Sequence, residues 1–353
     1  MKQPFDGLVR NDGEWLRGDG PMHEIVISTR IRLARNIAGF HFLSRADSEM
    51  RAEIAETVQA AVRKAGLLND FTHVDVDQLE ELERNLLVER QLVSRQHAEG
   101  IGARKVVFDE NEASAVMINE EDHVRIQVMR SGLQLEQAWE QINAVDDALE
   151  ARLEYAFHPQ YGYLTACPTN LGTGIRVSVM LHLPALRLTN ELERVGRAAK
   201  DLKLAVRGLF GEGTEAMGDF FQISNQITLG CEETAIIRAF HDGVIPEIVE
   251  YEKSARAALL DKRLYALDDK LFRAYGALQN ARLMSTSEAM QYLSHVRMGL
   301  HIGRLKTVDL QTVNQLFIQT QPAHLQALEG QRLNGEQRSI ARANLIRDRL
   351  SRN

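Results

Sequence analysis

The stretch RKVVFDENEASAVMINEEDHVRIQVM, Arg104 to Met129, contains three short apolar segments separated by polar turns around Glu110 and Glu120. The segments are rich in valine, isoleucine and phenylalanine, which is typical of strands. The turns are far shorter than the roughly twelve residues that a parallel crossover needs, so neighbouring strands must be antiparallel.

The same kind of pattern continues on both sides of this stretch. Apolar runs predict further strands at 22–28, 161–166, 175–182, 202–208 and 219–229, and helical periodicity predicts helices at 47–65, 77–92, 133–155 and 189–201. We therefore predict an α+β domain at residues 1–254, in which helices flank an antiparallel sheet.

Strand signals fade after Cys231, and helical periodicity takes over at 247–282, 286–300, 307–319, 322–329 and 336–351. Thr286 or Ser287, ahead of Glu288, and Asp309 are the residue types that begin helices. We predict an all-α C-terminal domain at 255–353. This tail is basic, with 15 Lys and Arg against 8 Asp and Glu, whereas residues 1–254 have 27 against 41.

Composition excludes several protein classes. The chain has 353 residues, of which 44% are hydrophobic and 26% charged, so it is long enough for two domains with sizeable cores. Its start lacks the apolar region of a signal peptide, and no run approaches the roughly 18 apolar residues of a membrane span, so we expect a cytoplasmic protein. Two cysteines, Cys167 and Cys231, are too few for a disulfide framework or a zinc site.

Four segments place arginines beside carboxylates or a thiol. They are STRIRLAR from Ser28, NEEDHVRIQ from Asn119, CPTNLGTGIR from Cys167 and RGLFGEG from Arg207. A cysteine among turn formers and polar groups stays reachable and can be activated, unlike an ordinary core cysteine. The chain has no Walker loop, and GEGTEAMG at 211–218 fails the G-x-G-x-x-G pattern, so a triphosphate must be bound in some other way.

These four segments, in this order, resemble the motifs of the phosphagen (guanidino) kinase family. The resemblance implies ATP as the phosphoryl donor and Mg²⁺ bound mainly through phosphates and water. It also implies a nucleotide site made by Ser28, Arg30, Arg32, Arg125, Arg176 and Arg207. Arg30 and Arg32 alternate on a strand and so share a face, whereas Arg35 points elsewhere and is expected to be structural.

Glu121 and Glu212 match the two catalytic glutamates of that family, which clamp a planar guanidinium. A guanidinium is a poor nucleophile while protonated, so one of these glutamates must accept a proton, and the sequence leaves open which one does. Cys167 is expected to contact the same guanidinium as a thiolate. His123 is interpreted as a hydrogen-bonded strand residue.

Over its whole length the chain resembles the McsB-type protein-arginine kinases. This resemblance implies phosphorylation of arginine side chains exposed on proteins, Clp-protease degradation of the marked proteins, and as partners a Clp unfoldase, an activator protein and a second copy in a homodimer. It also implies that Arg338 and Arg342 bind phosphoarginine, although Ser339 replaces the acidic residue of the family motif. No membrane partner is expected, and nucleic acid is disfavoured.

Two other functions stay open at this point. A small-molecule guanidino kinase would phosphorylate free arginine or a similar compound. A non-catalytic regulator would bind phosphoproteins or nucleic acid through the basic tail, and would show salt-dependent DNA binding.

Overall fold

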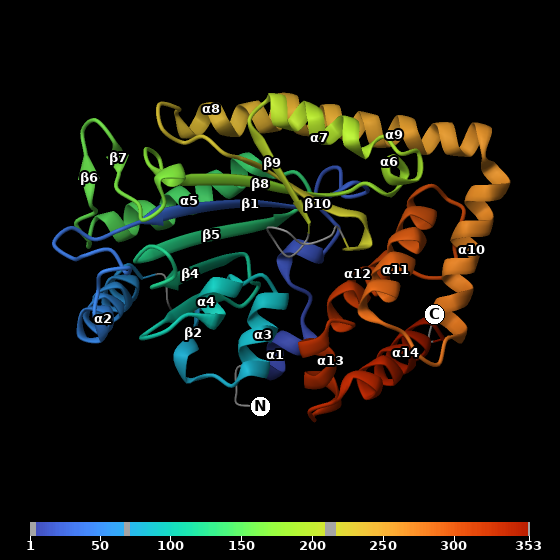
Figure 1. Cartoon of the computed structure of the whole chain (residues 1–353), viewed down its shortest axis with the longest axis horizontal. Helices are drawn as coiled ribbons and strands as arrows, with labels where there is room; N and C mark the ends of the chain where they lie inside the picture. Colours follow the sequence, from blue (N-terminus) through green and yellow to red (C-terminus); the bar gives the residue numbers. More distant parts are fainter. Residues whose placement is uncertain (1–4, 67–70, 209–216, 352–353) are drawn as a thin grey trace.

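An eight-stranded antiparallel sheet forms the centre of the computed structural model, which describes residues 5–66, 71–208 and 217–351 (Figure 1). The strand order is β2-β3-β4-β5-β1-β8-β10-β9. The strands are β1 Val26–Arg35, β2 Phe71–Asp75, β3 Lys105–Asp109, β4 Ser114–Ile118, β5 Val124–Ser131, β8 Ile175–His182, β9 Leu204–Gly208 and β10 Phe220–Asn225. A separate hairpin pairs β6 Phe157–His158 with β7 Gly162–Tyr163.

The helices of the first part of the chain precede, separate or follow these strands. They are α1 Phe5–Arg10, α2 Ser48–Lys64, α3 Glu81–Glu89, α4 Arg95–Glu99, α5 Leu135–Glu150, α6 Pro184–Leu188, α7 Leu192–Asp201, α8 Glu233–Arg238 and α9 Ile245–Lys262. The helices α10 Leu264–Asn280, α11 Thr286–His301, α12 Leu310–Gln319, α13 Pro322–Glu329 and α14 Gly335–Ser351 form the C-terminal part.

One face of the sheet is apolar and forms the core. Ile31 pairs in register with Val128 of β5 and Val177 of β8, and all three side chains are fully buried. Helix α5 contacts β1 and β5 and buries Ile142 in the same cluster. Because fully burying one such side chain contributes roughly 1.5–3 kcal/mol, this face fixes the sheet against its helices. On the opposite face, β3 and β4 carry a second apolar cluster that includes Val106, Phe108, Ala115 and Met117, whereas β1, β5 and β8 carry polar residues there.

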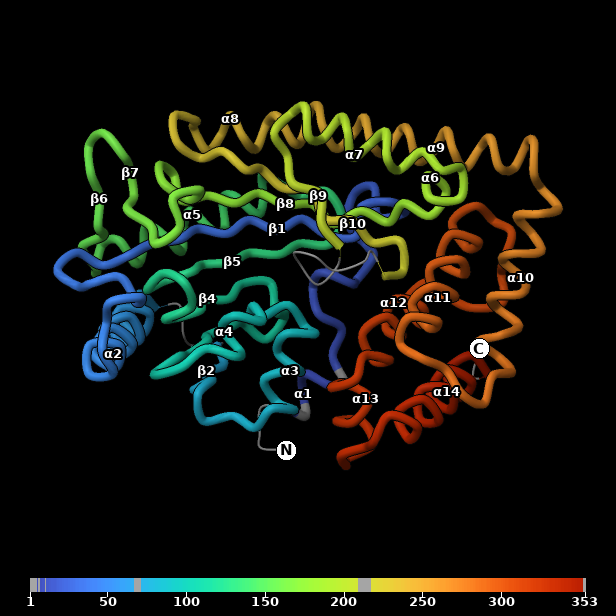
Figure 2. The backbone as a smooth tube through the Cα atoms, viewed as in Figure 1, coloured from blue at the N-terminus to red at the C-terminus, as the bar shows by residue number. Residues whose placement is uncertain are grey.

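The tail packs onto the sheet through buried polar contacts as well as apolar ones. Ser294 of α11 donates to the Asp219 carboxylate at 2.5 Å and contacts His182 at the end of β8 at 2.8 Å. Arg297 of the same helix donates to the backbone oxygens of His23 and Glu24. Helix α1 contacts α13, so the N-terminal segment also lies against the tail (Figure 2).

The predicted fold class is confirmed: an antiparallel sheet flanked by helices is followed by a helical region. Several boundaries differ from the sequence predictions. The periodic stretch 247–282 is two helices, because Arg263 leaves helical geometry (φ −138°, ψ 32°) and the chain changes direction between α9 and α10 (Figure 1). Strand β1 runs to Arg35, well beyond the predicted 22–28, since β5 and β8 pair with it on both sides. Edge strand β2 was not predicted.

Two predicted helix starts can be compared directly. Asp309 caps α12 by accepting the Thr312 amide at 2.7 Å, as predicted. Helix α11 is capped by Ser285, one residue before the predicted pair, and Glu288 completes a capping box with it. In the part of the chain that the structure describes, every helix is too short or too polar to cross a lipid bilayer.

Candidate functional site

Five arginines from four different regions of sequence lie on the polar face of the sheet. In the strand register Arg32 is opposite Arg176, Arg30 is opposite Ser178, and Arg207 is opposite Gln222, which itself pairs with Met180. Arg125 is opposite Ala34, two residues from Arg32. Because directly paired residues project to the same side of a sheet, this set occupies one face, which we call the arginine face. Ser28 is buried on the same face, opposite Met180.

The arginine face concentrates positive charge. Burial, together with repulsion from Arg125, Arg176 and Arg207, lowers the pKa of Arg30 to about 10. Burial and the same kind of repulsion hold the pKa of Arg32 well below its ordinary value. With a pKa of about 10, Arg30 stays protonated at neutral pH, and a cluster of guanidiniums on one face suits a ligand with several negative charges.

Glutamine and serine side chains orient two of these arginines. Arg30 donates to the side-chain oxygens of Gln222 at 2.5 Å and of Gln91 at 3.3 Å. Arg176 donates to Ser224 at 3.2 Å. Gln91 lies between α3 and α4, so this junction contacts the arginine face. These acceptors are uncharged, so they orient the guanidinium planes without adding negative charge.

Arg125 and Arg32 differ in how their charges are compensated. Arg125 forms an ion pair with Glu120 at 2.5 Å. By contrast, Arg32 makes no hydrogen bond or ion pair with any residue that the structure describes, and its Nε is shielded from solvent. An orphaned buried donor of this kind fits a phosphate oxygen that would complete its hydrogen bonding.

Two neighbouring glutamates, Glu120 and Glu121, lie in the turn between β4 and β5 and have different surroundings. Glu120 is buried, which favours its neutral form, but Arg125 and a 2.5 Å hydrogen bond from Ser94 outweigh burial and lower its pKa to about 2. Glu121 is half-buried, and burial with repulsion from Asp122 and Glu120 raises its pKa. Glu120 is therefore engaged by Arg125 and Ser94, whereas the half-buried Glu121 carboxylate is the candidate ligand for a cationic group.

Asp122 joins this turn to the segment that contains Cys167. Its buried carboxylate accepts the Ala166 amide at 2.6 Å and the Asn36 side-chain amide at 2.6 Å. Ala166 directly precedes Cys167, and Asp122 directly follows Glu121. The hydrogen bond between Ala166 and Asp122 therefore holds the backbone beside Cys167 against the backbone beside Glu121, and both of these neighbours are predicted site residues.

Cys167 is partly exposed and begins a short 3₁₀ turn, Pro168–Asn170. Its Sγ lies 3.0 Å from the Thr169 hydroxyl. His123 is fully buried and bonds the Ile37 amide and the His41 carbonyl, which agrees with a structural role. Glu212 lies outside the described residues.

Two family models match the chain. Residues 53–255 match ATP:guanido phosphotransferase, C-terminal catalytic domain, and residues 264–353 match Protein-arginine kinase McsB C-terminal domain. The chain belongs to the ATP:guanido phosphotransferase family.

Curated relatives and solved structures agree with this family. Proteins named protein-arginine kinase are 43% identical in Halothermothrix orenii, covering 98% of this chain and 99% of that protein, and 45% identical in Symbiobacterium thermophilum, covering 98% of both. A lombricine kinase structure has a TM-score of 0.58 at 26% identity over 71% of each chain. The taurocyamine kinase of Schistosoma mansoni with bound transition-state-analogue components has a TM-score of 0.54 at 25% identity, covering 65% of this chain and 32% of that one.

One further arginine of the STRIRLAR segment, Arg35, lies outside the arginine face. Arg35 points away from the arginine face to Asp146, with a 2.6 Å ion pair, and stacks on the Tyr163 ring at 3.6 Å. This agrees with the structural role expected for Arg35.

In the tail, Arg342 is buried and donates to the backbone oxygens of Thr320, Met284 and Arg338. Arg338 donates to the Leu333 carbonyl at 2.9 Å. Binding of a phosphate by Arg342 therefore requires it to exchange these carbonyls for phosphate oxygens, and the phosphoarginine role stays a prediction.

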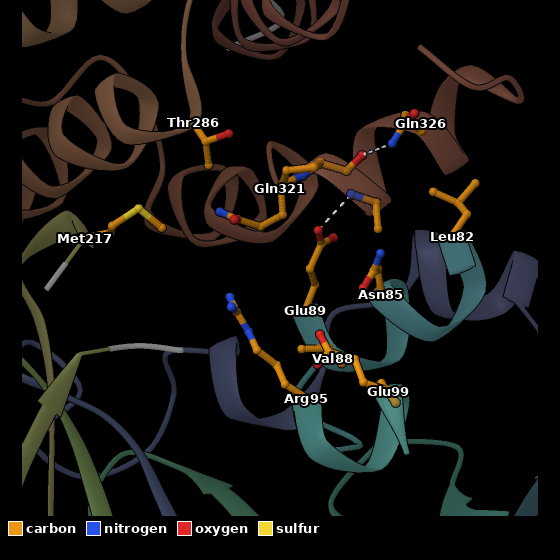
Figure 3. A pocket seen from close by; sticks show the side chains of 13 residues that line it. Leu82, Asn85, Val88, Glu89, Arg95, Glu99, Met217, Thr286, Gln321 and Gln326 are labelled. Carbon is orange, nitrogen blue, oxygen red and sulfur yellow. Dashed lines mark hydrogen bonds between the residues drawn. The ribbon is translucent and has the colours of Figure 1, made fainter. Parts of the chain in front are cut away.

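A cavity of about 450 Å³ separates α3 and α4 from α13 and the start of α11 (Figure 3). Glu89, on its wall, accepts the amides of Ala323 and His324 and so caps α13. None of the described residues that line this cavity belongs to the arginine face, so we do not assign it to the nucleotide.

Sequence reasoning missed the residues that hold the charged groups in place. Gln91, Ser94, Gln222 and Ser224 orient the arginines or Glu120, and Asp122 joins the Glu121 turn to the Cys167 segment. Glutamine and serine are common on surfaces, and no local pattern distinguishes those that face a site. Within the described residues, no group of three His, Cys, Asp or Glu side chains is arranged to hold a metal ion.

Proposed function

We propose that this protein transfers the γ-phosphoryl group of ATP to a guanidinium nitrogen of arginine side chains in proteins. The observation that carries the proposal is the arginine face: five guanidiniums on one side of one sheet, in a chain whose relatives named protein-arginine kinase match it over 98% of its length. The adjoining Glu121 turn and Cys167 segment supply acceptor-side groups beside that face.

The arginine face is proposed to bind the triphosphate, with Ser28, Arg30, Arg32, Arg125, Arg176 and Arg207 as the nucleotide site. Phosphoryl transfer is catalysed mainly by positioning and by stabilising charge on the phosphate oxygens, and one arginine can contribute about 10³–10⁵ in rate. Because Gln91, Gln222 and Ser224 already orient Arg30 and Arg176, little reorganisation is needed when the anion arrives. Mg²⁺, when bound, neutralises phosphate charge and is held mainly through phosphates and water.

The acceptor side is proposed to consist of Glu121, Glu212 and Cys167. The carboxylates accept N–H bonds from the planar guanidinium and hold one nitrogen in line with the γ-phosphorus. An N–P bond forms as the bond from the γ-phosphorus to the bridging oxygen breaks, ADP leaves, and one glutamate takes the proton that the attacking nitrogen loses. The Cys167 thiolate stabilises the same guanidinium and forms no covalent intermediate.

The other roles in the proposal follow from family resemblance. Residues 1–254 are proposed as the catalytic domain and 255–353 as a helical domain that docks phosphoarginine through Arg338 and Arg342 and contributes to a homodimer. A cytoplasmic location, an activator protein and delivery of the product to a Clp unfoldase belong to the same proposal. Helix α9 crosses the proposed boundary, and the apolar core continues from the sheet into the tail helices, so the two regions share packing.

The proposal is tested by incubating the protein with ATP, Mg²⁺ and an unfolded arginine-rich protein, followed by mass spectrometry under non-acidic handling. We expect acid-labile phosphate on arginine, and its loss with Glu121→Gln. Free arginine serves as the competing acceptor, because preferential phosphorylation of free arginine would identify a small-molecule guanidino kinase. ATP consumption without any phosphorylated acceptor would reject both functions.

A further inference from the structure

Two segments that border Cys167 carry large apolar side chains on the surface. On the β6–β7 hairpin, Phe157 is 58% exposed and Tyr161 45% exposed. After β10, Ile227 is 41% exposed and Leu229 49% exposed. Single exposed apolar residues are common and need no explanation, so the position of these four is what matters.

The hairpin is fixed directly to the Cys167 segment. The Tyr163 amide donates to the Gly172 carbonyl at 2.8 Å. Gly162 packs so closely on Gly172 that an added Cβ would lie 2.4 Å from the Gly172 oxygen. Since Gly162 also has a φ of 70°, a side chain there is excluded on two grounds. Figure 1 shows this hairpin projecting beyond the end of the sheet.

Aromatic contacts order the hairpin surface. The Phe157 ring meets the Tyr163 ring edge to face with centroids 5.4 Å apart. The Tyr161 ring stacks on His158 at 4.9 Å. A surface ordered in this way loses little conformational entropy when it binds another chain.

The second segment is attached to the same short stretch from Thr228. Its hydroxyl donates to the carbonyls of Thr169 at 2.9 Å and Leu171 at 2.5 Å. Thr228 lies between Ile227 and Leu229, so both exposed side chains are anchored within one residue of the Cys167 segment. We call Phe157, Tyr161, Ile227 and Leu229 the apolar rim.

Charge near the rim identifies what kind of chain it suits. Glu150, which accepts the Tyr163 hydroxyl at 3.3 Å, is exposed, and so are Glu154 and Glu232. Arg152, between the first two in sequence, is also exposed and donates to the Ala148 carbonyl at 2.6 Å, so the surroundings are acidic on balance. Residues 1–254 as a whole have 27 Lys and Arg against 41 Asp and Glu. An apolar surface with acidic neighbours complements a segment that has both apolar and basic side chains.

We propose that the apolar rim binds the apolar neighbours of the arginine to be phosphorylated, in an extended segment of the substrate protein. This inference rests on the proposed function and adds a sequence preference to it. In an extended segment, residues two to four positions from the arginine lie about 7–13 Å along the chain, which places them beyond the acceptor pocket and over the bordering surface. Arginines inside regular, folded helices or sheets cannot present their neighbours in this way.

The experiment compares kcat/KM for three acceptors: a peptide with one arginine flanked by leucine and phenylalanine, the same peptide with serine flanks, and N-acetylarginine amide. We expect the apolar peptide to be preferred roughly tenfold over the serine peptide, as for partial burial of one or two apolar side chains. The double variants Phe157→Ser/Tyr161→Ser and Ile227→Ser/Leu229→Ser should abolish the preference and leave N-acetylarginine amide turnover unchanged.

Phe272→Ser is the matched control, because Phe272 is a 52% exposed phenylalanine on α10 in the tail, and it should keep the preference. The single variant Tyr161→Ser keeps the Phe157–Tyr163 contact, so it tests the rim if the double variant unfolds the hairpin. Equal kcat/KM for the two peptides, or a preference that survives both double variants, would contradict the proposed binding of apolar neighbours by the apolar rim. Failure to phosphorylate all three acceptors would instead reject the proposed function itself.

Discussion

Replacing Arg32 with methionine should stabilise the ligand-free protein and abolish its response to ATP. Arg32 has no partner among the described residues, its Nε is shielded, and neighbouring guanidiniums repel it. Methionine has a similar length and no charge, so it relieves the repulsion without leaving a large void.

The magnitude follows from the cost of a shielded charge that Glu120 attracts through space but that no described residue contacts directly. Replacing a buried ion pair with apolar residues of similar volume is often neutral or stabilising by about 1–4 kcal/mol, and Arg32 has no hydrogen-bonded partner among the described residues. Because Arg32 is only partly buried, we expect the lower half of that range, about 1–2 kcal/mol. At roughly 2–4 °C per kcal/mol, the Tm should rise by a few degrees.

The assay is thermal unfolding with and without ATP, and Arg35→Met is the control on the same strand. Arg35 faces the other way and is paired with Asp146, with exposed side-chain fractions of 2% and 9%. Removing it leaves Asp146 buried and unpaired, which should cost about 3–5 kcal/mol. ATP at 100 times its Kd should stabilise the wild type by about 2.7 kcal/mol and so raise its Tm. It should not raise the Tm of Arg32→Met.

Two results would refute this reasoning. One is a Tm for Arg32→Met that falls as far as that of Arg35→Met, which would mean that Arg32 is compensated within the fold. The other is an unchanged ATP-induced shift in Arg32→Met, which would remove Arg32 from the nucleotide site.

Four further predictions concern the acceptor side and the tail. Glu212→Ala should lower turnover by roughly 10² or more with an unchanged circular dichroism spectrum, and near-wild-type turnover would exclude the assignment. Cys167→Ser should lower kcat while calorimetry shows ATP affinity largely kept, so loss of ATP binding would contradict its acceptor-side placement. The raised pKa of Glu121 predicts that the acid limb of kcat/KM lies above the ordinary glutamate value of about 4.3, because the clamp must be ionised, and a limb at or below that value would argue against it. Burial lowers the pKa of His295 to about 4. The unfolded chain therefore binds a proton on this imidazole at a higher pH than the folded chain does. The free energy of unfolding falls as pH drops from about 6.5 toward 4, by roughly 2 kcal/mol at pH 4.5. Urea unfolding at pH 7 and 4.5 should show that loss reduced in His295→Gln.

The shared face of the arginines in the candidate site was predictable in part, because some of these residues lie in short, local patterns. Alternation on a strand places Arg30 and Arg32 on one face whatever the surrounding fold. The position of Glu121 within its motif favoured it over Glu120, and the structure supplies a physical reason, since Glu120 is engaged by Arg125 and Ser94.

Other features depend on contacts between distant residues. The sequence indicated the α+β class, the helical tail and the motif order, because hydrophobic periodicity and turn residues act over a few positions. Only the tertiary structure decided that β1 lies between β5 and β8, which gathers arginines from distant segments, and that Asp122 joins Glu121 to the Cys167 segment. It also decided that Arg342 is turned toward backbone carbonyls in the tail. Strand order and buried hydrogen bonds are set by the packing of the whole chain, so no short window of sequence contains them.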